Sequence, residues 1–264
     1  IGLNYKVAKD IEIYSNFSQN YRSINFSDMQ IKNQNFKINP NLQDERGYNS
    51  DLGIRGNIKS KLYFDASIYT LFYKNRIGSQ LKKEKNSNRI EQTFQYRTNI
   101  AQSRTIGFEM MVEADWINII SKQSNENKLT TFVNFSYNDA NYIQSNVSAY
   151  EYNKVELVPP IVFKTGISLS KKIYSISYQF SYTDAHFSDA TNAVITENAA
   201  IGVINAYYTM DLSAKINFKS FQLETGINNL SNEIYFTRRA TGYPGPGILP
   251  SPTRNYYLGL QYKF

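Results

Sequence analysis

The chain has 264 residues, a formal net charge of +7, one histidine and no cysteine. Without cysteine, disulfides, thiol catalysis and Cys-ligated zinc or iron–sulfur clusters are excluded. Mean hydropathy is −0.48. No apolar run approaches the ~20 residues of a spanning helix, so a helical membrane protein is excluded. The 22 Tyr and 16 Phe argue against disorder. The basic charge permits nucleic acid, acidic lipid or a small anionic ligand as partner.

From the first residues onward, apolar and polar side chains alternate with a period of two, which is typical of β-strands with two different faces. The clearest example runs from Ile173 to Thr183, where aromatic or apolar residues alternate with Ser, Gln and Thr. The same pattern predicts eleven strands, over 2–8, 10–21, 47–58, 61–76, 103–116, 128–140, 160–170, 173–184, 205–218, 221–230 and 253–264.

The connections between these strands alternate in length. Short turns are expected near residues 9–10, 59–60, 171–172 and 219–220, and a longer polar connection over 117–127 belongs to the same set. Long connections are expected over 22–46, 77–102, 141–159, 185–204 and 231–252. Outer-membrane β-barrels have short periplasmic turns and long extracellular loops. Trp116 closes one strand beside a short-turn end, where an aromatic girdle would sit.

The charges separate by face. The apolar tracks, such as Leu62, Phe64, Ile68 and Phe72, contain no charged residue. The opposite tracks hold Glu12, Asp51, Arg55, Asp65, Glu109, Glu113, Asp115, Lys164, Asp211, Lys215 and Glu224. A soluble β-sandwich also separates charge from its core face. Loop asymmetry and the tyrosine-rich tracks favour the membrane, where a Lys or Arg facing the lipid midplane costs about 2–4 kcal/mol.

The final strand carries an unbroken apolar track that ends in Phe264. This track resembles the C-terminal signature of bacterial outer-membrane barrels. If residue 264 lies on the periplasmic side, the last strand runs from the extracellular to the periplasmic side. The first of eleven strands then runs in the same direction. The two would be parallel neighbours if the sheet closed on itself. Bacterial single-chain barrels have even strand numbers and antiparallel closure. The expectation is therefore the C-terminal half of a larger barrel.

Four segments resemble TonB-dependent outer-membrane receptors. Residues 39–45 are similar to the family's Asn-Pro-x-Leu-x-x-Glu segment, and residues 99–109 to its Asn-x-x-x-Ser-x-x-x-Gly-x-Glu segment. Residues 226–235 look like Gly-x-x-Asn-Leu-Phe-Asp-x-x-Tyr, with Ser231 and Asn232 in place of Phe-Asp. Residues 235–250 resemble the last extracellular loop of ferric-citrate-type receptors.

This resemblance implies an all-β, antiparallel transmembrane barrel of 22 strands, of which residues 1–264 form the last eleven. It implies an N-terminal plug, and neither a plug nor a TonB box is recognisable in this sequence. The implied function is active uptake of an iron chelate, such as ferric citrate or a ferric siderophore, driven by TonB–ExbB–ExbD. The implied location is the outer membrane of a Gram-negative bacterium, in contact with lipid and lipopolysaccharide, with no enzymatic activity, resident cofactor or metal site.

Anionic chelates need fixed cations, and the planar fork of arginine suits carboxylates. We expect Arg238 and Arg239, in the segment with the most specific resemblance, to contact ligand, together with Arg97. Tyr243 begins a Tyr-Pro-Gly-Pro-Gly segment that could shape a loop over the ligand. Other loop cations, such as Lys82, are expected to be solvated or to pair with lipopolysaccharide.

Alternatives remain open. A passive porin would need no plug, and a soluble β-rich domain would not partition into membranes. An outer-membrane hydrolase could use Asp184, His186, Ser188 and Asp189 for nucleophilic catalysis, although a histidine in a polar loop is usually only solvated. Nucleic-acid binding is disfavoured because the basic residues are dispersed over loops and turns.

Overall fold

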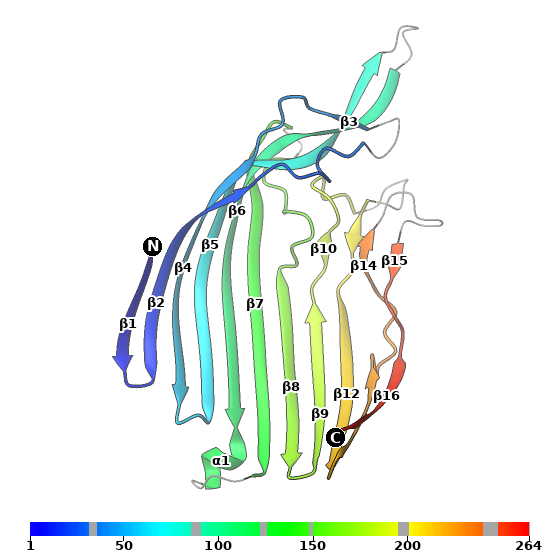
Figure 1. Cartoon of the computed structure of the whole chain (residues 1–264). Coiled ribbons are helices and arrows are strands. Elements are labelled where there is room, and N and C mark those ends of the chain that lie inside the picture. Colours follow the sequence, from blue (N-terminus) through cyan, green and yellow to red (C-terminus); the bar gives the residue numbers. More distant parts are fainter. Residues whose placement is uncertain are drawn as a thin grey trace.

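In the computed structural model, an antiparallel sheet dominates the chain (Figure 1). The structure describes residues 1–31, 36–85, 91–121, 126–147, 150–194, 201–239 and 248–263. Within these ranges eleven strands follow one another as neighbours in a meander: β1 (Gly2–Ala8), β2 (Ile11–Arg22), β4 (Glu45–Ile58), β5 (Leu62–Lys85), β6 (Glu91–Asp115), β7 (Lys128–Ser145), β8 (Ile161–Lys171), β9 (Tyr174–Thr183), β12 (Tyr207–Phe218), β13 (Phe221–Asn228) and β16 (Asn255–Tyr262). The prediction of eleven strands is confirmed. Phe264 lies outside the described residues.

The shorter elements lie in the connections. They are β3 (Phe36–Ile38), α1 (Trp116–Ser121), β10 (His186–Phe187), β11 (Val203–Ile204), β14 (Phe236–Arg239) and β15 (Ile248–Pro250). β10 pairs with β11, and β14 pairs with β15. None of the helices in the described ranges has the length and hydrophobicity needed to cross a membrane.

The two kinds of connection lie at opposite ends of the sheet (Figure 1). Three of the short turns use residues with positive φ, at Lys59 (52°) and Ser60 (56°), at Lys172 (29°) and at Lys219 (51°). Positive φ matches the twist of two-residue hairpins. The expected connection over 117–127 includes α1, so Trp116 begins a helix rather than closing a strand. Its indole Nε1 donates to Thr131 Oγ1 at 2.8 Å.

One expected loop is largely strand. Residues 77–102 were predicted as a connection, but β5 continues to Lys85 and β6 begins at Glu91. The register shifts at Tyr73, Arg76 and Ile77, and pairing then resumes as far as Lys85↔Glu91. This shift breaks the period-two pattern from which the strand ends were predicted. The extended hairpin rises past the rest of the sheet, and β3 pairs with β6 in parallel beside it (Figure 1).

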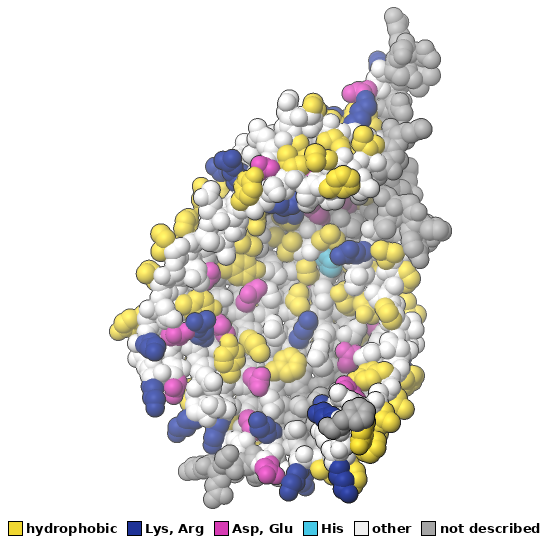
Figure 2. Space-filling view, viewed as in Figure 1, with side chains coloured by type: hydrophobic (Ala, Val, Ile, Leu, Met, Phe, Trp, Pro, Cys, Tyr) yellow, Lys and Arg dark blue, Asp and Glu magenta, His cyan; other side chains and the backbone are white. Residues whose placement is uncertain are grey.

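Cross-strand pairing extends each face over many strands. Leu52, Ile68, Phe108 and Tyr137 are successive partners on one face. On the other face Glu12, Arg55 and Asp65 are successive partners, and Tyr14 Oη donates to Asp65 Oδ1 at 2.7 Å. Figure 2 shows charges of both signs across the face turned to the viewer. The predicted separation of charged and apolar tracks thus becomes two continuous surfaces.

The apolar surface is not covered by protein. Leu52 is 50% exposed, Ile68 57% and Tyr137 46%. Apart from Ala114, the buried hydrophobic residues in the described ranges lie toward the long-loop end, where Ile100, Tyr142 and Val155 belong to one cluster. A soluble sandwich would bury its apolar face against a second layer. An uncovered apolar face instead suits contact with lipid.

A lysine in the middle of the apolar track should therefore impair membrane insertion. We expect Ile68→Lys to lower the stability of the intact protein in phospholipid vesicles by about 2–4 kcal/mol, because the charge would face hydrocarbon. The matched control is Ser67→Lys, one residue away on the polar face. Denaturant titration in vesicles measures both, and equal effects would contradict the assignment of the two faces.

Candidate functional site

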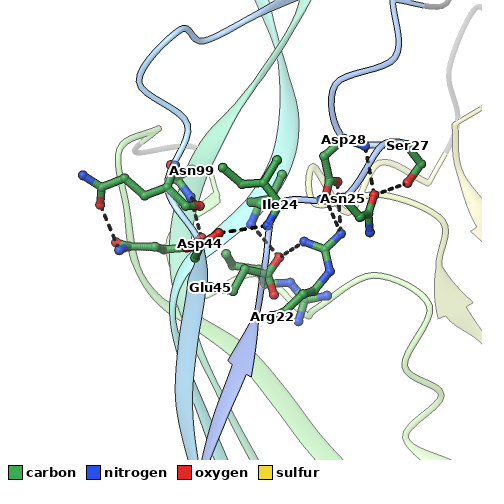
Figure 3. A network of polar contacts seen from close by, with 12 residues as sticks. Arg22, Ile24, Asn25, Ser27, Asp28, Asp44, Glu45 and Asn99 are labelled. Carbon is green, nitrogen blue, oxygen red and sulfur yellow. Dashed lines mark hydrogen bonds and ion pairs between the residues drawn. The ribbon is translucent and has the colours of Figure 1, made fainter.

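The polar face ends, on the long-loop side, in a network built around a buried carboxylate. Asp28 is 0% exposed and lies in the connection between β2 and β3. Its carboxylate accepts from Arg22 Nη2 at 2.8 Å (Oδ2) and 3.0 Å (Oδ1), from Arg97 Nη2 (Oδ1) and from the backbone N–H of Asn25 at 3.1 Å (Oδ2). Figure 3 shows Arg22 between Asp28 and Glu45. The network joins β2, β4 and β6 to the loop.

The charge of Asp28 is maintained by these contacts. Burial by itself raises the pKa of the Asp28 carboxyl, but the hydrogen bonds from Arg97, the Asn25 amide and Arg22 outweigh burial and hold the pKa below its ordinary value. Asp28 therefore stays ionised and aligns the two arginines.

Arg97, one of the predicted ligand residues, keeps part of its donor capacity. Its Nη2 is bound to Asp28, while its buried Nε has no hydrogen-bond partner among the described residues. Unpaired buried donors are uncommon and require an explanation. Here the guanidinium is fixed by Asp28 while its buried Nε stays unsatisfied by the described residues.

The sequence motifs hold this region together. Asn99 Oδ1 accepts from the Gln43 backbone N–H at 2.8 Å, and Asn99 Nδ2 donates to the carbonyls of Gln43 (2.8 Å) and Asn75 (2.6 Å). Asn39 Nδ2 donates to Thr98 Oγ1 at 2.8 Å. The segments 39–45 and 99–109, recognised separately in the sequence, are thus bonded to each other and position the start of β4 against β6.

A second group of polar residues lies next to this network. Arg76 Nη2 is 3.8 Å from Glu156 Oε1, and Tyr142, which is 0% exposed, donates from Oη to Glu156 Oε2 at 2.5 Å. Arg76 and Arg22 line one open recess of about 420 Å³, together with Asn20, Tyr21, Glu45, Tyr73 and Ile77. We call this the mouth recess. It presents two guanidinium groups and one carboxylate to solvent.

The other predicted arginines lie elsewhere. Arg239, on β14, donates from Nε (3.2 Å) and Nη2 (2.8 Å) to the carbonyl of Val203 in β11, so its cation helps to join two short sheets. Arg238 is exposed on the same strand. No described contact links either residue to Arg97. Tyr243 lies outside the described residues.

Sequence reasoning missed Asp28, Glu156 and Tyr142. Asp28 bonds to residues 6 and 69 positions away, so no local spacing marks it. Tyr142 was expected to lie in a loop, but it belongs to β7.

The residues proposed for hydrolysis do not form a catalytic arrangement. His186 Nδ1 contacts the backbone carbonyl of Asp184 at 3.0 Å. Ser188 Oγ instead accepts from the Gly202 amide (3.0 Å) and lies 3.5 Å from Asp189 Oδ2. No hydrogen bond between His186 and Ser188 is present in this part of the structure. Among the described residues no group of three or more His, Cys, Asp or Glu could hold a metal ion.

The comparisons with known proteins identify the family. Residues 1–230 match the family described as TonB dependent receptor-like, beta-barrel. The chain belongs to this family. No curated protein sequence matches the chain.

Solved structures share the fold at low sequence identity. The ferric citrate transporter FecA in its unliganded form is 15% identical with a TM-score of 0.74, covering 98% of this chain and 37% of FecA. The siderophore receptor PiuA from Acinetobacter baumannii is 18% identical with a TM-score of 0.72, covering 100% of this chain and 35% of PiuA. The copper transporter OprC is 14% identical with a TM-score of 0.72, covering 100% and 38%. The receptor chain therefore spans less than two-fifths of each relative.

Acid should release the loop that carries Asp28. Because the folded pKa of Asp28 is depressed, its contribution to stability is complete above the ordinary value of 3.8 and is lost as pH falls through the folded pKa. We expect hydrogen–deuterium exchange of residues 23–31, corrected for intrinsic rates, to accelerate below about pH 4. Asp28→Asn should exchange rapidly at every pH. An Asp28→Asn loop that stays as protected as the parent at pH 7 would contradict this role.

Proposed function

We propose that the receptor chain forms the C-terminal half of the wall of a 22-stranded outer-membrane barrel, which imports an anionic iron chelate such as ferric citrate or a ferric siderophore. The meander ends in β1 on one side and β16 on the other, and no pairing joins these two strands in the described residues (Figure 1). A bilayer tolerates no open sheet edge, so both edges need partner strands. Family membership and the exposed apolar face support a location in the Gram-negative outer membrane.

The observation that carries the proposed ligand class is the set of arginines fixed at the mouth of the polar face. Arg97 and Arg22 share the buried Asp28, and Arg76 and Arg22 line the mouth recess. Arginine donates in a planar fork that matches carboxylates, and a guanidinium held in advance loses little freedom on binding. Citrate and many siderophores bind iron as anions, which such a site would favour.

The energy source is proposed from family membership. A plug and a TonB-contacting segment, coupled to ExbB–ExbD, would belong to parts of the receptor outside residues 1–264. In this proposal residues 1–264 supply part of the lumen wall and the ligand contacts, and they have neither enzymatic activity nor a resident cofactor. The copper transporter among the structural relatives shows that the fold is compatible with more than one cargo. The proposal of an iron chelate therefore rests on the mouth arginines.

A passive porin is the main alternative, and energy coupling separates the two. In cells that produce the intact receptor, uptake of radiolabelled ferric citrate or ferric siderophore should stop when an uncoupler collapses the proton-motive force, whereas surface binding should persist. If the protein were a porin, the chelate would enter the periplasm at the same rate with and without the uncoupler. Periplasmic accumulation is the quantity to measure, because inner-membrane transport also consumes energy.

The mouth arginines should contribute to affinity. We expect Arg97→Lys to weaken chelate binding to the intact receptor by about 10- to 100-fold, because lysine keeps a cation for Asp28 but loses the planar fork. Arg238→Gln tests the exposed cation on β14 and should also weaken chelate binding. Equilibrium titration with ferric citrate and with an anionic ferric siderophore measures both variants.

The matched control is Arg254→Gln, an exposed arginine at the same end of the sheet that precedes the outward track of β16. It should leave affinity unchanged. Protection of residues 23–31 from hydrogen exchange verifies that Arg97→Lys preserves the loop. Unchanged affinity in both Arg97→Lys and Arg238→Gln would overturn the proposed contact residues.

A further inference from the structure

One arginine of the mouth recess is held far less tightly than the other. Arg22 is bonded to two carboxylates, those of Asp28 at 2.8 Å and Glu45 at 3.0 Å. Arg76 forms one ion pair within the described residues, in which its Nη2 lies 3.8 Å from Glu156 Oε1. This separation exceeds the length of a hydrogen bond. Both side chains are partly exposed, Arg76 at 27% and Glu156 at 22%. Such a pair contributes little, so Arg76 can change its partner at low cost.

The position of Glu156 does not depend on Arg76. Its other oxygen, Oε2, accepts from the buried hydroxyl of Tyr142 at 2.5 Å. Tyr142 and Tyr73 are both cross-strand partners of Ser103, so Tyr142 lies in the same inner-face row as a residue that lines the recess. Arg76 Cζ lies 5.9 Å from the centre of the Tyr142 ring. A buried tyrosine therefore holds a carboxylate beside the guanidinium that lines the recess.

The segment that carries Glu156 is fixed to its surroundings on two sides. Val155 is 2% exposed, and its amide donates to the carbonyl of Ala140 in β7 at 3.0 Å. Lys154 and Asn192 exchange two hydrogen bonds of 2.6 and 2.9 Å. These contacts join the connection between β7 and β8 to the sheet and to the connection that follows β9.

Two residues that border this segment have strained backbone conformations. φ is 65° at Tyr152 and 60° at Leu157, in the left-handed region where bulky residues are uncommon. Their side chains are 79% and 53% exposed, so burial of these side chains does not compensate for the strain. Such conformations persist only where surrounding contacts hold them. The loss of one contact should therefore loosen residues 153–156.

We propose that Glu156 is an internal competitor of the ligand: its carboxylate holds Arg76 in the unliganded receptor, and a carboxylate of the anionic chelate takes its place. This inference rests on the proposed function and adds a regulatory contact to the same site. A ligand carboxylate in the mouth recess can accept from the fork of Arg76 at hydrogen-bond distance, which Glu156 Oε1 does not reach. When Arg76 turns to the ligand, Glu156 keeps its bond to Tyr142, and residues 153–156 lose one of the contacts that hold them.

The test measures binding of the intact receptor to ferric citrate, to an anionic ferric siderophore and to a neutral ferric trihydroxamate. Glu156→Gln should tighten binding of the two anionic chelates about three- to fivefold, the gain expected when a partly exposed ion pair no longer competes. Glutamine keeps an acceptor oxygen for Tyr142, so the segment should stay attached to β7. Affinity for the neutral probe should not rise.

The matched control is Glu151→Gln, which removes a carboxylate from the same connection. Glu151 forms no ion pair with a described residue, so both classes of chelate should bind this variant like the parent. A double-mutant cycle then isolates the pair. Arg76→Gln should weaken binding of the anionic chelates, and in that background Glu156→Gln should no longer tighten it, because the competitor has lost its target.

Hydrogen exchange of residues 150–158 provides a second readout. Exchange should accelerate when a saturating anionic chelate is added to the parent, and it should already be faster in unliganded Glu156→Gln. Exchange that the chelate leaves unchanged in the parent would contradict displacement of Glu156.

The sign of the Glu156→Gln effect decides between two roles. An acid that orients Arg76 for the ligand would be needed for affinity, so weaker or unchanged binding of the anionic chelates would overturn the competition. In that case the parent still binds these chelates, and the proposed ligand class stands without this inference. If the parent binds none of them, the proposed ligand class fails and the inference fails with it.

Discussion

The sheet has one continuous apolar face that protein does not cover and one polar face, and the rest of the structure follows from this division; in the proposed placement the apolar face meets lipid and the polar face meets the lumen. Leu52, Ile68 and Tyr137 remain exposed on this apolar face, as expected if hydrocarbon rather than protein covers them. Backbone groups in hydrocarbon must be paired within the sheet, which agrees with the long ladders from β4 to β9; their register shifts, after Tyr73 and at Gln102, lie toward the long-loop end. Charges are confined to the inner face or to the borders.

The same constraint determines where chemistry is possible. At the long-loop end of the sheet, side chains form buried contacts with the loops. The network around Asp28 and the cluster around Tyr142 both lie there. On the inner side the arginines are oriented by acids, as Asp28 orients Arg22 and Arg97. Paired inner arginines suit recognition of a defined small anion.

The sequence predicts the strands of the sheet well and the polar contacts at its long-loop end poorly. Period-two alternation locates all eleven strands because it records which face each side chain occupies, and it errs where the register shifts between Tyr73 and Ile77. Asp28 is not predictable from local pattern, since its role depends on Arg97 far along the chain. Arg97 was predicted from its position before a motif, and the structure adds its unpaired Nε. Arg238 and Arg239 stand apart from it because β14 packs beside β11, a tertiary contact without a local signature.

We propose that a fixed set of lumen arginines selects an anionic iron chelate. The most direct measurement is equilibrium binding of the intact receptor to a panel of ferric chelates that differ in net charge, each titrated at low and high salt. Anionic chelates are expected to bind more tightly than neutral ones, and this difference in affinity should shrink as salt screens the arginines. Equal affinity for neutral and anionic chelates at every salt concentration would contradict selection by these arginines.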